Sequence, residues 1–279
     1  MRSLLSMSRS LSLRVEFKIP EQGMERFEVL SRGTCFFIAR HSGDPTLLSA
    51  SHISHPFLWK SRFYPELEWL SFVQEEHVRR VIEFRCPESG DLLGESEALG
   101  EAVPHKDLDL VKVDCSEVLR DGSLGMPRIV PLVGDKDDFV GTTCTVDGFV
   151  LRPRPEAEEG TSTTDSITGV DDLPSADVHA NASECTGVLY PESVRGELVA
   201  RGDVRAMVRT DAVLEMGACG APVVFMDEER DQELCIGLVE GIVPLLPEDH
   251  QEGTAAAFYE KYQGCASVIN HEVLRSFVA

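Results

Sequence analysis

The sequence contains no long uncharged apolar run: its best stretch, Cys235 to Leu246, is interrupted by Glu240 and Pro244. A membrane-spanning helix needs about 18 or more consecutive apolar residues, so the sequence predicts no membrane span. Positive charge is also scarce, with 26 Lys and Arg against 48 Asp and Glu, a formal net charge of −22. Because such a field repels phosphate groups, we expect no nucleic-acid partner.

Closely spaced cysteines are absent as well. The 8 cysteines are scattered, with no Cys-x-x-Cys pair and no apolar stretch typical of a secretory signal. A chain of 279 residues can bury a core that folds without disulfide staples. We therefore expect free thiols in a reducing, intracellular compartment, although the even number leaves disulfides as the alternative.

The first fifteen residues lack acidic side chains and carry three arginines and five serines. This composition is typical of an organellar transit peptide, and it also fits a basic tail or the approach to a first strand. We treat residues 1–27 as a basic N-terminal segment. The expected location is mitochondrial, with the cytoplasm as the alternative.

Short apolar segments of strand character follow, separated by clusters of Gly, Pro, Asp and Ser; they span 34–39, 46–50, 80–84, 108–113 and 142–151. Such regular short strands predict an all-β barrel or sandwich rather than alternating β-α units.

The later part of the chain differs. Residues 154–183 are acidic, rich in Ser, Thr and Gly, and poor in large apolar side chains, which predicts a mobile insertion. Strand patterns then resume, and 270–277 has the apolar spacing of a short closing helix. We expect two β-lobes, over 28–125 and 126–279, with the helix ending the second lobe.

Three separated elements carry residues suited to nucleophilic catalysis. An apolar strand ends in small residues and a histidine at Ser49–His52, and a carboxylate, Asp107, begins the strand that runs to Val113. A carboxylate of this kind can accept the Nδ1–H of a histidine and stabilise the imidazolium. The third element is the turn Gly217-Ala218-Cys219-Gly220, where glycines let backbone amides converge beside a thiol.

These elements together resemble the chymotrypsin-like proteases, whose catalytic residues follow the order His, Asp, nucleophile. Ser49–His52 resembles the family's "TAAH", Asp107–Val113 its "DLALLKV", and Thr210–Val224 the "TDA…GNSGGPLV" of HtrA-type peptidases. Gly33–Ile38 is similar to the "GSGFII" strand, and Ile236–Val239 to the strand after the nucleophile. The resemblance runs from about residue 30 to the end.

The resemblance implies a fold of two six-stranded β-barrels with a C-terminal helix, and an endopeptidase with a Cys-His-Asp triad. His52 would be the base, Asp107 its orienting carboxylate and Cys219 the nucleophile, with the amides of Gly217 and Cys219 as the oxyanion hole. Val213 would lie at the floor of the primary specificity pocket, offering no carboxylate to a Lys or Arg side chain.

The resemblance also implies that Gly237, Leu238 and Val239 line an extended peptide or protein substrate, and that no cofactor is needed. Cysteine stands where most of the family has serine, as in the viral 3C-like cysteine proteases. Because a sulfur can abolish activity in a site shaped for a hydroxyl, the alternative is an inactive pseudopeptidase that serves as a scaffold or subunit of a protein complex.

Two further alternatives concern single residues. Asp109 could replace Asp107 as the partner of His52, although its spacing from the apolar residues of the strand fits less well. Cys219, His52 and Asp107 could instead bind a metal, but they lack the closely spaced ligand pair that is typical of zinc sites.

Overall fold

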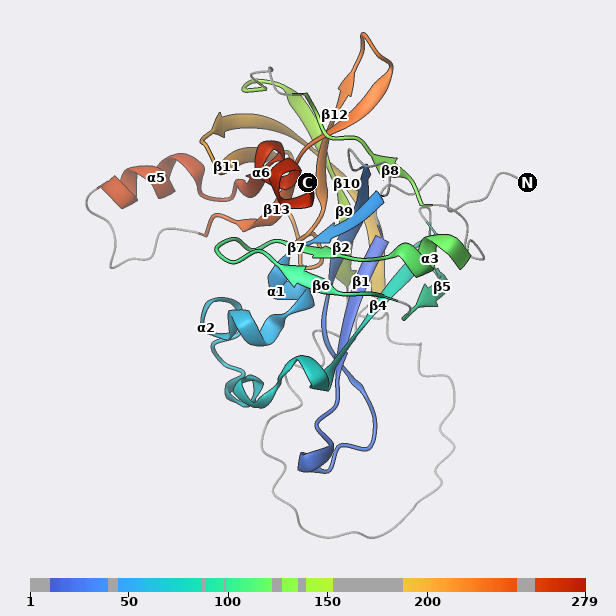
Figure 1. Cartoon of the computed structure of the whole chain (residues 1–279). Coiled ribbons are helices and arrows are strands. Elements are labelled where there is room, and N and C mark those ends of the chain that lie inside the picture. Colours follow the sequence, from blue (N-terminus) through green and yellow to red (C-terminus); the bar gives the residue numbers. More distant parts are fainter. Residues whose placement is uncertain are drawn as a thin grey trace, which may run out of the picture.

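The computed structural model describes residues 11–39, 45–86, 89–97, 99–121, 127–134, 139–152, 188–244 and 254–279. Of the described residues, 48% lie in strands and 21% in helices, in two largely antiparallel sheets (Figure 1). The expected mobile insertion at 154–183 lies outside the described residues, as do the first ten residues of the chain.

The first sheet contains β1 to β8. Its order is β5-β4-β1-β2-β3-β7-β6, and β8 pairs in parallel with β2. The strands are β1 (Leu11–Phe17), β2 (Glu28–Ala39), β3 (Pro45–Ser49), β4 (Val78–Arg85), β5 (Leu92–Ser96), β6 (Ala102–Pro104), β7 (Val111–Val113) and β8 (Ile129–Val130).

Six strands form the second sheet, which closes on itself in the order β10-β11-β14-β13-β12-β9. They are β9 (Thr143–Arg152), β10 (Val188–Arg201), β11 (Arg205–Thr210), β12 (Pro222–Asp227), β13 (Gln232–Ile242) and β14 (Ala266–Asn270).

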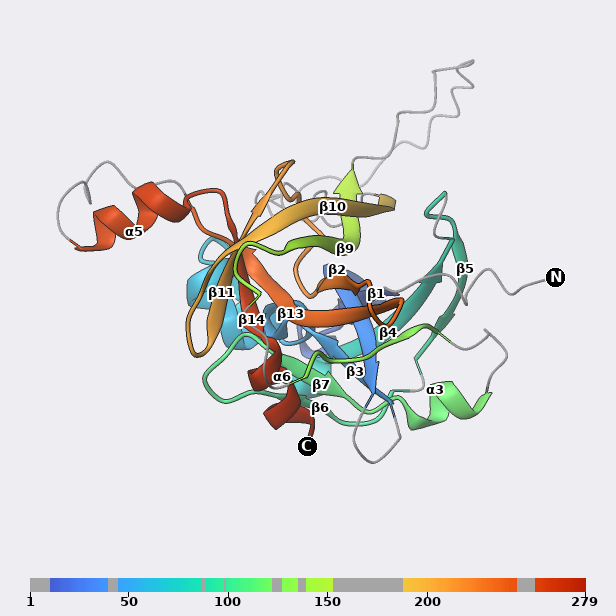
Figure 2. The same cartoon turned by 90° about the horizontal axis from the view of Figure 1, so that it is seen from above.

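Helices are short and lie mostly between strands. The α-helices are α1 (Ser51–Ser54), α2 (Lys60–Phe63), α3 (Ser116–Asp121), α5 (Thr254–Tyr262) and α6 (His271–Val278); the 3-10 helices are η2 (Pro20–Gln22), η3 (Pro56–Trp59), η4 (Glu68–Phe72) and η5 (Glu75–His77). The expected closing helix is confirmed as α6. Helix α5 projects from the side of the closed sheet (Figure 2). Within the described part of the chain, none of the helices has the length and apolar character needed to cross a membrane.

The expected lobe boundaries need two corrections. The first sheet begins at residue 11, not 28, because β1 pairs with β2 on one side and with β4 on the other. It also extends past residue 125, since Ile129 and Val130 pair with β2. The Arg and Ser content of the N-terminus obscured β1, although its apolar positions Leu11, Leu13, Val15 and Phe17 are all buried.

A shared apolar layer joins the two sheets. It contains Phe36 and Leu48 from the first sheet, Val224 and Leu238 from the second, and Leu274 from α6. Because one cluster draws on both sheets, the sheets are packed against each other at the edge where β2 meets the second lobe. The cysteines at 35, 115, 144, 219, 235 and 265 carry free thiols, in agreement with the expectation that these residues form no disulfides.

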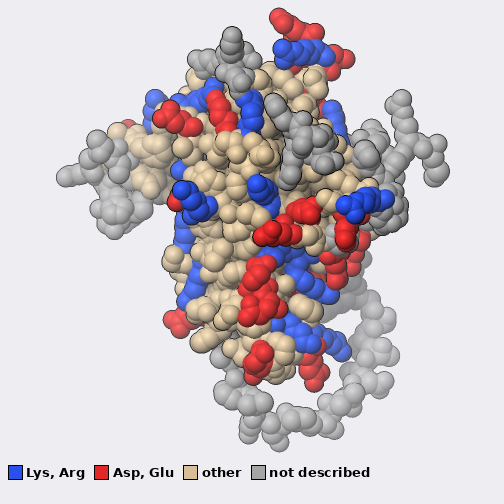
Figure 3. All heavy atoms as spheres, viewed as in Figure 1, with Lys and Arg blue, Asp and Glu red and all other residues tan. Residues whose placement is uncertain are grey.

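A buried carboxylate anchors charged side chains in the first sheet. Glu83 is fully buried and accepts hydrogen bonds from Arg14 at 2.5 Å, Arg85 at 2.8 Å and Ser12 at 2.9 Å. Burial alone would raise the pKa of Glu83, but the charges of Arg85 and Arg32 and the hydrogen bonds from Arg85 and Ser12 lower it. At the surface, acidic and basic side chains are interspersed over the face seen in Figure 3.

We expect Glu83→Gln to lower the free energy of unfolding by about 3 kcal/mol at neutral pH, because it leaves buried guanidinium groups without their counter-charge. Since the carboxyl pKa is lowered by folding, its stabilisation is present above its ordinary value of 4.5 and is lost as the pH falls through the lowered value. Urea unfolding at neutral and acidic pH measures the difference, which should shrink on acidification. Glu95→Gln, on a carboxylate 43% exposed, is the matched control; an equal loss in both variants would contradict the prediction.

Candidate active site

His52 lies at the junction of the first sheet with helix α1. The strand β3 ends at Ser49, and Ala50 precedes the first turn of α1. These small residues let the chain turn tightly into the core, so His52 is only 5% exposed. The position of the histidine is therefore set by the end of a buried strand.

Asp109 fixes the orientation of His52 through two hydrogen bonds. The Oδ2 atom of Asp109 lies 2.5 Å from His52 Nδ1, and its Oδ1 atom accepts the main-chain amide of His52 at 2.7 Å. Asp109 is fully buried. A carboxylate that holds both the ring and the backbone of a histidine leaves Nε2 as the ring atom available to other groups.

The assignment of Asp107 as the partner of His52 is wrong. Asp107 is 69% exposed beside Lys106, and its amide donates to His105 Nδ1. The chain turns between His105 and Leu110, whose backbone groups bond to each other, and β7 begins only at Val111. Asp107 therefore lies in the exposed part of this turn, and Asp109 is the residue that enters the core.

Cys219 lies in a turn that the first sheet holds in place. Thr34 of β2 donates its hydroxyl to Gly217 O at 2.7 Å, and its amide donates to Cys219 O at 2.9 Å. The Cys219 side chain is half-buried against the core of the first sheet. The turn belongs to the second lobe in sequence, but it is attached to the first.

The two glycines of this turn have conformations that other residues rarely adopt. Gly217 has φ +103° and Gly220 has φ +84°. A Cβ at Gly217 would lie 2.8 Å from the Phe149 carbonyl oxygen, and one at Gly220 would overlap the Thr34 carbonyl oxygen. The Gly-x-Cys-Gly sequence is thus required both by backbone conformation and by space.

The four amides of this turn differ in their hydrogen bonding. Ala218 and Gly220 donate their amides to Glu215 and Val239. By contrast, within the described part of the molecule the amides of Gly217 and Cys219 donate no hydrogen bond. Donors of this kind beside a nucleophile can stabilise a developing oxyanion.

His52 and Cys219 are electrostatically linked. Burial of the imidazole lowers the pKa of His52, but the neighbouring Cys219 and the hydrogen-bonded carboxylate of Asp109 outweigh it and raise the pKa to about 10. The histidine therefore stays protonated between Asp109 and Cys219 at neutral pH. The structure thus brings His52 and Cys219 together, with Asp109 in place of Asp107.

The expected substrate-binding residues need correction. Gly237, Leu238 and Val239 lie within the closed sheet, where Gly237 pairs with Val223 and Asn270, and Val239 exchanges backbone hydrogen bonds with Gly220 and Ala221. Their backbone groups are used by the fold, so they are not open to a substrate strand.

Val213 also departs from its expected place. It is 79% exposed, so it does not form the floor of an enclosed pocket. The family resemblance placed it by counting back from the nucleophile, and that count does not carry over to this loop.

Sequence reasoning missed the aromatic and charged groups around His52. Phe63 of α2 stacks on the imidazole, with ring centroids 4.1 Å apart and an interplanar angle of 14°. Its neighbour Arg62 reaches Glu240 Oε1 at 3.6 Å, and Glu240 is also bound by Arg205 at 2.6 Å. The only signal for these residues in the sequence is the aromatic content of 56–72, which does not indicate what the rings contact.

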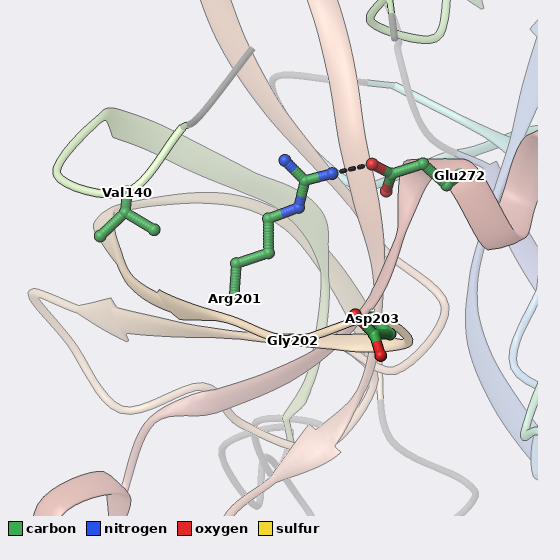
Figure 4. Close-up of a pocket in the computed structure, with 5 residues that line it drawn as sticks. All are labelled: Val140, Arg201, Gly202, Asp203 and Glu272. Carbon is green, nitrogen blue, oxygen red and sulfur yellow. Dashed lines mark ion pairs between the residues drawn. The ribbon is translucent and has the colours of Figure 1, made fainter. Parts of the chain in front are cut away.

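A separate hollow lies on the second lobe between β10, β11 and α6. It is lined by Val140, Arg201, Gly202, Asp203 and Glu272, and Arg201 forms an ion pair with Glu272 (Figure 4). No residue of the His52–Cys219 site lines it. Among the described residues, no cluster of three or more His, Cys, Asp or Glu side chains is arranged to hold a metal ion.

Comparison of the chain with models of known protein families and with curated protein sequences gives no match.

Proposed function

We propose that this protein is a cysteine endopeptidase of the chymotrypsin-like type, with Cys219 as nucleophile, His52 as base and Asp109 as orienting carboxylate. The observation that carries the proposal is the placement of one buried histidine between a buried carboxylate and a thiol at a glycine-flanked turn. This is the arrangement by which a base activates a nucleophile and is itself held by a third group.

The reaction would proceed by acyl transfer. His52 already holds the proton that Cys219 gives up, and the sulfur attacks the peptide carbonyl carbon. The amides of Gly217 and Cys219 then stabilise the oxyanion, a contribution of about 3 kcal/mol per donor. His52 returns its proton to the departing amine, and a water molecule, deprotonated by His52, hydrolyses the thioester and regenerates the thiol.

The double-barrel fold is part of the same proposal. The second sheet is closed, and one apolar core of the first sheet includes Leu13, Phe37 and Val111. We propose that the first sheet is the counterpart of the family's first barrel. The catalytic residues would then lie between two barrels, with His52 and Asp109 from the first and Cys219 from the second.

A mitochondrial location remains our proposal for the intracellular site of action, with the cytoplasm as the alternative. Because β1 is an inner strand, cleavage of a leader beyond Leu11 would remove part of β1 from the first sheet. A cleaved leader compatible with this fold therefore ends before β1.

The second candidate function is an inactive scaffold, and one observation favours it. His52 is 5% exposed and one face of its ring is covered by Phe63, which limits the approach of a substrate. In this reading the protein binds other proteins through its surface and performs no turnover.

Labelling with an electrophilic peptide probe tests the proposal. We expect the probe to modify Cys219 in preference to the other cysteines, and Cys219→Ala to remove the labelling. His52→Ala should slow it by about a hundredfold or more, because the base is lost. The matched control is His55→Ala: this buried neighbour bonds to Ser54, and burial and the charge of Arg80 lower its pKa to about 4, so it is neutral at physiological pH.

The pH dependence gives the same test a second readout. Because His52 stays protonated up to about pH 10, the rate of Cys219 labelling should vary little from neutral pH towards that value. Free thiols in the unfolded chain should instead react faster as the pH rises through their ordinary range. Equal labelling of several cysteines, with no effect of His52→Ala, would refute the peptidase. Stable association with other proteins in the absence of labelling would support the scaffold.

A further inference from the structure

The rings of Phe63 and His52 stack face to face. The rings are almost parallel, at 14°, and their centroids are 4.1 Å apart. Parallel stacking covers one face of the imidazole and leaves both ring nitrogens in the open plane. One nitrogen, Nδ1, is bound to Asp109, so the other is directed to the remaining partner, Cys219.

Helix α2 is held over the histidine from two sides. Tyr64 donates its hydroxyl to the carbonyl oxygen of His52 at 3.1 Å. Arg62 lies over the ring of Phe63, 5.1 Å from its centroid, and reaches Glu240 of β13 at 3.6 Å. These contacts connect α2 both to the histidine backbone and to the second lobe, so the place of Phe63 is determined by the surroundings of the site.

Ordinary core packing does not account for this placement. The nearby apolar cluster contains Phe57, Tyr64, Leu67 and Trp69, but Phe63 belongs to none of the core clusters in the described part of the fold. The described aromatic partners of its ring are His52 and the edge of Trp59. An aromatic ring outside the core that stacks on the histidine is better explained by an effect on the histidine.

We propose that Phe63 is a positioning residue for His52. It blocks rotation of the imidazole out of the plane that joins Asp109 to Cys219, and it excludes water from the short Nδ1–Oδ2 hydrogen bond. Its π face also favours the protonated imidazole over the neutral one. The inference rests on the proposed thiol–imidazole chemistry, but the shielding of the His52–Asp109 bond is testable without turnover.

Two measurements on three variants test the proposal. Phe63→Leu removes the ring, Phe63→Tyr keeps it, and Phe72→Leu removes an aromatic ring that is 61% exposed and takes no part in the contacts with His52 described above. The first measurement is the proton NMR signal of His52 Nδ1–H, which lies far downfield in so short a hydrogen bond and disappears when water exchanges the proton. The second is the saturation kinetics of the electrophilic peptide probe on Cys219.

We expect Phe63→Leu to lose the downfield signal and to lower the maximal rate of labelling by about tenfold, with little change in the half-saturating probe concentration. Phe63→Tyr and Phe72→Leu should keep both the signal and the rate. If Phe63→Leu behaves like Phe72→Leu, or if Phe63→Leu and Phe63→Tyr fail equally, the proposal is overturned.

The proposal stays testable if Phe63→Leu does not fold or if the wild-type protein does not label. If circular dichroism shows that Phe63→Leu is unfolded, Phe63→Met, with an unbranched side chain of similar size, takes its place with the same expected results. If the wild-type protein does not label at all, the peptidase proposal fails, whereas the downfield signal still decides whether Phe63 shields the histidine.

Discussion

Asp109→Asn should lower the rate at which Cys219 reacts with a peptide probe by about a thousandfold, whereas Asp107→Asn should leave it unchanged. An amide at position 109 can donate a hydrogen bond to Nδ1, which stabilises the wrong tautomer of His52 and leaves the imidazolium without a counter-charge. Asp109 is fully buried and lies 2.5 Å from the ring, whereas Asp107 is an exposed carboxylate two residues earlier. The two variants remove the same charge, so only position differs between them.

The measurement is the second-order rate constant of Cys219 labelling, determined by mass spectrometry of the Cys219 peptide. Thermal unfolding and circular dichroism of both variants show whether the fold is kept. Equal rates in the two variants would mean that Asp109 does not act on His52. A greater loss in Asp107→Asn would restore the assignment made from sequence resemblance alone.

The second large effect concerns the stability of the nucleophile turn. Gly220→Ala should lower the free energy of unfolding by about 4 kcal/mol, because the new Cβ combines a strained backbone conformation with backbone overlap. Gly220 has φ +84°, and a Cβ there would overlap Thr34 O and lie 2.8 Å from Ser49 Oγ. Thr34 O is a backbone atom, and the buried Ser49 hydroxyl is held by its hydrogen bond to that oxygen at 2.8 Å, so the turn itself has to move.

Two other glycines separate the causes of this loss. Gly141 has φ +85°, and no atom of the described residues lies within 4 Å of a Cβ there, so Gly141→Ala should cost about 1 kcal/mol from conformation alone. A Cβ at Gly241 would likewise meet no atom of the described residues within 4 Å, and Gly241 has no positive φ, so Gly241→Ala should be close to neutral. Denaturant unfolding of the three variants measures the series. A loss at Gly220 no greater than at Gly141 would show that the close approach to Thr34 has no cost.

Much of the second lobe could be predicted from the sequence because its patterns are local. The glycine-flanked cysteine indicates a tight turn, and the structure has positive φ at both glycines. The apolar spacing of 270–277 indicates a helix, and α6 spans His271–Val278. In both cases the determining residues are within a few positions of one another.

The carboxylate and the first strand were harder to place, since their signals are weak or ambiguous. Asp107 and Asp109 have the same parity along the chain, so alternation cannot separate them. Only the turn between His105 and Leu110 decides which side chain enters the core. Leu11–Phe17 is buried on both faces, and its Arg and Ser neighbours gave it the composition of a targeting segment.

The contact between Phe63 and His52 could not be predicted from sequence at all. The two residues are close in the chain, but their contact depends on the path of η3 and α2, two helices of four residues each. Short helices of this kind have no periodic pattern of apolar residues. A single aromatic residue in the sequence does not indicate which side chain its ring will contact. The same holds for Glu240 and Arg62, which are brought together by the docking of two sheets.

Thr34 joins two parts of the chain that the ribosome synthesises at different times. This residue, near the start of the chain, binds the carbonyl groups of Gly217 and Cys219, which are synthesised much later. Its hydroxyl also accepts the amide of Phe149 at 3.0 Å. A nascent chain therefore carries its histidine and carboxylate long before the thiol is presented to them. In the proposed peptidase, the thiol would become reactive only when translation has supplied the second lobe and the two halves have met, which protects unfinished chains from their own chemistry.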